Sequence, residues 1–167
     1  MRDESRGESS SSQTFWWLWR KTWELGILGK IKHFIWRAYH NSFPTSHNLF
    51  RRKITLNPFC NIYDQEEEFT YHALWKCAMA RNTWALVPGR VQKLPNQVED
   101  FPRFMLWIFQ NFSKKEVEDW ATTSWAIWSA RNCYIFEDHQ KNPQQIRTEA
   151  LIHLREYHHA NTPNSPL

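Results

Sequence analysis

The sequence predicts an all-α protein, built as a bundle of helices. Apolar residues recur at intervals of three and four over most of residues 14–159, which is the period of an amphipathic helix. Residue pairs that typically start helices stand where apolar stretches begin, such as Ser113 with Glu116 and Asn142 with Pro143. No stretch alternates between apolar and polar residues as a half-buried strand does.

The composition is that of a globular protein with an aromatic core. The chain has 167 residues, of which 41% are hydrophobic, and it contains 11 tryptophans and 11 phenylalanines. The net charge is +4 at pH 7. This charge permits an anionic partner such as nucleic acid, but a slightly basic solvated surface explains it equally well.

The first helical pattern follows a polar N-terminus. Residues 1–13 are charged and rich in serine, which predicts disorder. From residue 14 onward, Trp16, Trp19 and Trp23 fall on one helical face, and we expect Trp16 and Trp19 to lie in the core.

The next two helices are predicted from residues 30–53. The first has a stripe at the spacing of a buried helix face, formed by Ile31, Phe34, Ile35, Ala38 and Tyr39. The second follows a break at Pro44, after which Thr45 or Ser46 can cap a short helix.

A further helix is predicted from Tyr71 until the chain reaches Pro88 and Gly89. Residues 89–100 read as a linker, and residues 101–112 as a short apolar helix. The next helix starts with the capping-box pair of Ser113 and Glu116, and its apolar face contains Val117, Trp120, Ser124, Trp125 and Trp128.

The last predicted helix begins with Asn142 as its cap and Pro143 in its first turn, and has Ile146, Ala150 and Leu154 on its apolar face. The predicted organisation is therefore a disordered N-terminus over 1–13, a first domain over 14–88, a linker over 89–100, a helical segment over 101–159 and a disordered tail over 160–167.

The sequence favours an intracellular protein, in the nucleus or the cytoplasm. The N-terminus lacks the apolar segment of a secretory signal. No uncharged apolar run reaches the roughly 18 residues of a membrane helix, so no membrane association is expected. In a reducing compartment, cysteines serve metal binding or packing more often than disulfides. We expect Cys133 to be a core residue.

The sequence offers no catalytic motif. The stretch from Gly26 to Ile31 is too short for a phosphate-binding loop, and no Ser or Thr follows its lysine to hold magnesium. A nucleophile elbow and paired polymerase-type aspartates are absent. The run Glu66 to Glu68 reads as a solvated face. We therefore expect neither an enzyme nor a small-molecule substrate.

The segment CNIYDQEEEFTYHALWKC has the spacing of a small metal site. Cys60, His72 and Cys77 are three of the four ligands that a tetrahedral structural zinc requires. Tyr63 stands at the fourth position, where its protonated phenol is a poor ligand, and the neighbouring Asp64 could supply an oxygen instead. In the alternative interpretation the two cysteines are buried apolar residues and the histidine is hydrogen-bonded beside Trp75.

This segment resembles the zinc-binding domain of plant non-LTR (LINE-type) retrotransposon reverse transcriptases. That family shows a Cys-x2-Cys-x8-His-x4-Cys pattern with a glutamate run and a His-Ala-Leu sequence, and here only Tyr63 departs from it. The upstream stretch KIKHFIWRA and the downstream stretch WAIWSARN are also similar to the family, although Gly29 replaces a frequent proline. The resemblance covers residues 15–88 well and 117–138 more loosely.

The resemblance implies a zinc-knuckle-like site in an accessory module that binds RNA or DNA. The chain lacks the polymerase and ribonuclease H modules of such polyproteins, so it is similar to a truncated fragment. Two alternatives stay open: a helical protein–protein interaction fragment with an inactive metal site, which would pack on a polymerase or another partner chain, and a non-functional remnant that aggregates because its aromatic surface is exposed.

Two groups of basic residues are candidates for nucleic-acid binding. Basic side chains neutralise phosphates, and exposed aromatic rings can stack on unpaired bases. A solvated basic face is the alternative. The candidates are Lys30, Lys32, Arg37, Arg51, Arg52 and Lys53.

Overall fold

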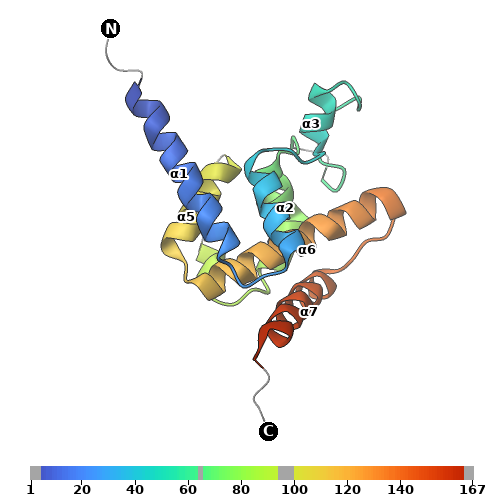
Figure 1. The fold of residues 1–167 in the computed structure, drawn as a ribbon. Helices are drawn as coiled ribbons and strands as arrows, with labels where there is room; N and C mark the ends of the chain where they lie inside the picture. Colours follow the sequence, from blue (N-terminus) through green and yellow to red (C-terminus); the bar gives the residue numbers. More distant parts are fainter. Residues whose placement is uncertain (1–4, 64–65, 94–99, 164–167) are drawn as a thin grey trace.

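The computed structural model describes residues 5–63, 66–93 and 100–163, and within these ranges it is an assembly of helices without a strand (Figure 1). The prediction of an all-α fold is confirmed. A single antiparallel bridge joins Phe59 to Glu67. The elements are α1 (Ser5–Trp23), α2 (Gly29–Tyr39), α3 (Ser46–Arg51), the π-helix η1 (His72–Lys76), α4 (Ala78–Trp84), the 3₁₀-helix η2 (Arg90–Lys93), α5 (Phe101–Asn111), α6 (Lys114–Glu137) and α7 (Pro143–Asn161).

Helix α6 is the centre of the molecule. Its buried residues include Trp120, Ile127 and three alanines, and they point in several directions around the helix axis. A helix that is buried on most sides must be surrounded by others. It packs against α7, α2, η1, α4 and α5, and Figure 1 shows it crossing the molecule behind α2.

Several local predictions from the sequence are confirmed. In α2, Ile31, Phe34, Ile35 and Ala38 are buried as their spacing predicts. Thr45 caps α3 by accepting a hydrogen bond from the backbone N–H of Asn48 at 3.2 Å. The predicted caps of α6 and α7 are present, each as a complete capping box, at Ser113 and Asn142.

Other predictions about burial are wrong. Trp16 is 60% exposed, because the inward face of α1 is formed by Leu18 and Thr22 instead. Trp19 is only half-buried, and it packs on Trp36 of α2 at a ring distance of 4.2 Å. Cys133 is half-exposed and lies 3.5 Å from Glu137, so it is not a core residue.

Helix α1 begins at Ser5, so most of the segment predicted to be disordered is helical. Once the tryptophan-bearing turns are packed, each further residue adds one backbone hydrogen bond to the helix without a new nucleus, and this favours extension towards the N-terminus. At the other end, α7 continues to Asn161, slightly beyond the predicted boundary at 160. Residues 1–4 and 164–167 lie outside the described residues.

The segments predicted as 14–88 and 101–159 share one hydrophobic core. The ring of Phe43 stacks on Trp128 at 4.4 Å, and Tyr71 contacts Phe104 at 5.1 Å. The predicted linker is partly structured, since η2 lies within it and buries Val91. Residues 94–99 of that linker are outside the described residues. The described helices include none that combines the length and the apolar character needed to cross a membrane.

Candidate metal centre

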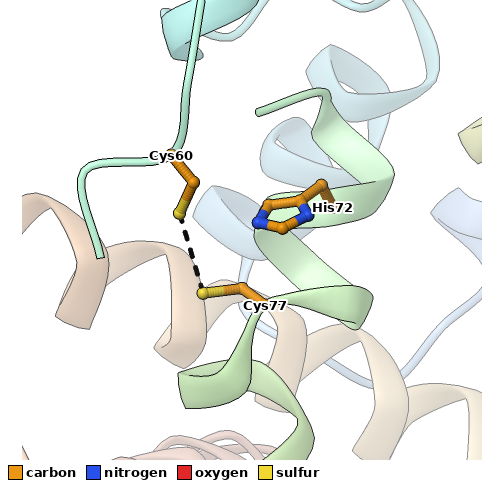
Figure 2. A group of neighbouring side chains, drawn as sticks. All are labelled: Cys60, His72 and Cys77. Carbon is orange, nitrogen blue, oxygen red and sulfur yellow. Dashed lines mark hydrogen bonds between the residues drawn. The ribbon is translucent and has the colours of Figure 1, made fainter. Parts of the chain in front are cut away.

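Cys60, His72 and Cys77 converge at one buried point, although they come from separate parts of the chain (Figure 2). Cys60 is on the loop after α3, His72 begins η1, and Cys77 lies at the junction between η1 and α4. One ligand atom from each residue lies within 4.8 Å of the others. Each of the three residues is at most 5% exposed.

The π-helical turn of η1 brings His72 and Cys77 together. The backbone N–H of Cys77 donates to the carbonyl of His72 at 2.8 Å, which closes a turn over five residues. The sequence predicted one continuous α-helix from Tyr71, but a five-residue step does not match the α-helical turn of 3.6 residues. The wider turn places both side chains on the same side, and such turns are frequent at functional sites.

The loop that carries Cys60 is held at both ends. The backbone N–H of Cys60 donates to the carbonyl of Glu66 at 2.9 Å, and the backbone N–H of Glu68 donates to the carbonyl of Pro58 at 2.9 Å. These bonds place residues 58–60 beside residues 66–68. Backbone hydrogen bonds therefore hold Cys60 beside the segment that leads into η1.

The donor atoms fit a tetrahedral zinc ion. The two sulfurs are 3.9 Å apart, which is too long for a disulfide. Zinc–sulfur bonds of about 2.3 Å at tetrahedral angles would place two sulfurs about 3.8 Å apart. The Nε2 atom of His72 is buried and has no hydrogen-bond partner among the described residues. A buried nitrogen without a partner is costly, and metal ligation would relieve that cost.

Glu66 orients the histidine. Its carboxylate lies 3.1 Å from His72 Nδ1, so Nδ1–H donates and Nε2 is left facing the two sulfurs (Figure 2). Metal-ligating histidines typically make such a bond with their second nitrogen. Glu66 is exposed, as its place in a glutamate run predicts, but that run did not predict its bond to His72. The available signal was the place of that run shortly before the histidine.

The two thiols have opposite pKa shifts. The hydrogen bond with Cys77 and burial raise the pKa of Cys60 above its ordinary value. The hydrogen bond from Cys60 lowers the pKa of Cys77 to about 7, against burial, and the backbone N–H groups of Met79 and Ala80 contribute. Burial lowers the pKa of His72, but its contacts with Cys60 and Glu66 outweigh this, and the pKa is raised overall.

Residues 6–84 match the family model described as zinc-binding in reverse transcriptase. This segment is similar to the zinc-binding domain of reverse transcriptases. No curated protein and no solved structure matches the chain.

The matched segment contains Cys60, His72 and Cys77. Tyr63 is also inside it; its side chain is 48% exposed and borders a cavity next to His72 and Cys77. Asp64, the predicted substitute ligand, lies outside the described residues. Helix α6, which packs against η1, lies outside the matched segment.

The candidate basic residues of this domain form two separate groups. On α2, Lys32 donates to the backbone carbonyl of Trp23 at 2.8 Å, and Lys30 lies 4.4 Å from the centre of the Trp125 ring. Arg37 packs over Phe43 at 5.4 Å. The second group, Arg51 to Lys53, is exposed at the end of α3. Among the described residues, no carboxylate pairs with any of the six.

Proposed function

We propose that this chain is a non-catalytic, retroelement-derived nucleic-acid-binding module whose structure depends on a zinc ion. Cys60, His72 and Cys77 are the protein ligands. The observation that carries this proposal is the buried convergence of their three ligand atoms within 4.8 Å. The resemblance to LINE-type elements makes a reverse transcriptase of that type the proposed parent.

Zinc would act on nucleic-acid binding through the loop that it closes. Glu68, in this loop, contacts the start of α3: the backbone N–H of Ser46 donates to the Glu68 side chain at 2.8 Å, and that of His47 donates to the Glu68 carbonyl at 3.2 Å. Helix α3 leads directly into Arg51, Arg52 and Lys53. A metal ion that rigidifies the loop therefore also fixes the basic group.

The surface around α3 has the features of a single-strand binding site. Phe50 is 45% exposed and directly precedes the basic group of Arg51 to Lys53. Phe69 is 44% exposed and directly follows Glu68 of the loop that carries Cys60. Exposed rings stack on bases while unpaired cations hold the backbone phosphates. Helix α3 lies to one side of the bundle, where an extended strand has access (Figure 1).

A second candidate function is docking to another protein. Leu56 is 98% exposed and Ile54 is 66% exposed, on the same stretch of chain as the basic group. Apolar side chains of this exposure contribute more to a protein interface than to phosphate binding. This function predicts self-association or partner binding that salt weakens little.

Binding of fluorescent single-stranded RNA and DNA at several salt concentrations tests the proposal. Replacing Arg51, Arg52 and Lys53 by glutamine should weaken binding at least tenfold and lower the salt slope by up to ~2, since each phosphate contact on a single strand contributes about 0.7. The control with the same loss of charge replaces Lys114, Lys115 and Arg155 and should bind normally. Absent binding in the unaltered chain, together with salt-insensitive oligomers, would support protein docking instead.

A further inference from the structure

We propose that the zinc centre takes a phosphate group from solution as its fourth ligand. This inference rests on the proposed zinc ligation by Cys60, His72 and Cys77. Centres with three protein ligands are commonly completed by water or substrate, whereas structural centres are closed by a fourth side chain. Here the fourth position of the family pattern holds Tyr63, whose side chain is half exposed.

A cavity leads to the centre from outside. It has a volume of about 240 Å³, and the described residues that line it include His72 and Cys77 together with Tyr63. Since one water molecule occupies about 30 Å³ of liquid, this space has room for a phosphate and part of its substituent. The ligand set thus has an opening on the side where the family has its second cysteine.

The charges around the cavity favour an anion. Lys76 and Arg81 line it, both are exposed, and neither has an ion-pair partner among the described residues. The acidic side chain that the described lining contains, Glu66, is already engaged by His72. Two thiolates neutralise the charge of a zinc ion, so Lys76 and Arg81, even against the negative charge of Glu66, leave a net positive charge for an incoming anion.

An oxyanion such as phosphate suits this arrangement better than a halide ligand. A guanidinium presents a planar fork of donors that matches two phosphate oxygens, and a lysine adds a mobile point charge. Arg81 and Lys76 supply one of each beside the metal ligands. The phosphate could come from a free monoester or from a nucleic-acid backbone, and the experiment separates these sources.

The test uses the full chain loaded with Co²⁺ in place of zinc, because the visible absorption of cobalt reports its ligands directly. Thymidine 5′-monophosphate, an eight-residue oligothymidylate without terminal phosphate, and thymidine are titrated separately. The proposal predicts a saturable spectral change with one or both phosphate compounds and none with thymidine. A response to the monophosphate alone identifies a monoester site, and a response to the oligonucleotide identifies a backbone site.

Variants locate the effect. Replacing Lys76 and Arg81 by glutamine should raise the half-saturating concentration at least tenfold. The matched double variant of Lys115 and Arg155, which line a different cavity, should leave it unchanged. Tyr63→Cys should bind cobalt and lose the response, because a fourth cysteine closes the centre.

Several results would overturn the inference. The first is a spectrum of bound cobalt that no phosphate compound changes. This result would leave the proposed zinc ligation intact. The second is a response that appears only in Asp64→Asn, which would show that Asp64 is the fourth ligand. The third is an unchanged response in Tyr63→Cys, which would place the phosphate elsewhere. A chain that binds no cobalt would overturn the zinc ligation as well.

Discussion

Arg131 and Glu68 form a buried ion pair that joins two distant parts of the chain. Arg131 Nε donates to Glu68 Oε2 at 2.8 Å, and a second bond joins Nη2 to Oε1. Both side chains are at most 4% exposed. Glu68 belongs to the loop that carries Cys60, and Arg131 belongs to the stretch WAIWSARN on α6. The two stretches that resemble the retroelement family are therefore parts of one packed structure.

This pair should be essential for stability. Arg131→Met leaves the Glu68 carboxylate buried with Ser46 as its remaining partner. Removing one member of a buried pair typically costs about 3–5 kcal/mol. We expect a loss of this size in the free energy of unfolding, measured by urea denaturation. The double variant with Glu68→Gln should be more stable than Arg131→Met alone; equal or lower stability would contradict the coupling.

The two glycines that flank the start of α2 should respond differently to alanine. A Cβ at Gly26 would lie 2.9 Å from Glu118 Oε1, the atom that accepts the Gly26 N–H. Moving Glu118 away breaks that bond, so Gly26→Ala should cost about 1–2 kcal/mol. At Gly29 a Cβ meets nothing within 4 Å, and alanine should stabilise by up to ~1 kcal/mol. Thermal unfolding of both variants checks the difference, and equal shifts would contradict it.

Glu66 should affect zinc affinity while its neighbour does not. Glu66 bonds to the ligand His72, whereas Glu67 pairs with His47, outside the centre. Loss of a partner that orients a metal ligand typically reduces affinity 10- to 100-fold. We expect this loss in Glu66→Gln and little change in Glu67→Gln, measured by competition with a coloured chelator. Equal losses in the two variants would mean that only the net charge matters.

The capping box of α6 should make stability depend on acid pH. The backbone N–H of Ser113 lowers the pKa of Glu116, and Arg90 contributes. A carboxyl group whose pKa is lower in the folded than in the unfolded protein stabilises the fold at pH values above its unfolded pKa. This stabilisation is lost as the pH falls through the folded pKa. In Glu116→Gln the free energy of unfolding should therefore fall less steeply below about pH 4.5, which is the ordinary pKa of a glutamate. Ser113→Ala should cost about 1 kcal/mol at neutral pH. An unaltered acid profile in Glu116→Gln would exclude this role.

The sequence predicted the features that depend on neighbours along the chain. The buried stripe of α2 and the caps at Thr45, Ser113 and Asn142 follow from spacing and from side-chain hydrogen bonding to the nearest turn. The grouping of Cys60, His72 and Cys77 was also predicted, because the spacing of the motif itself carried the information.

Features that depend on distant residues were missed. Burial of Glu68 requires Arg131, which lies 63 positions away, and a glutamate run alone predicts solvent exposure. Trp16 has the spacing of a core residue, but which face of α1 turns inward is set by how α2 and α5 pack on it.

Zinc content of the purified chain tests the central claim most directly. Elemental analysis would be run on the unaltered chain, on Tyr63→Cys and on Cys77→Ser, each dialysed against a weak chelator. We expect about one zinc per chain in the first two and almost none in Cys77→Ser. Zinc in Tyr63→Cys alone would contradict it, because the geometry would then be present without a functional ligand set. Zinc in none of the three would show that the convergence of Cys60, His72 and Cys77 does not form a metal centre.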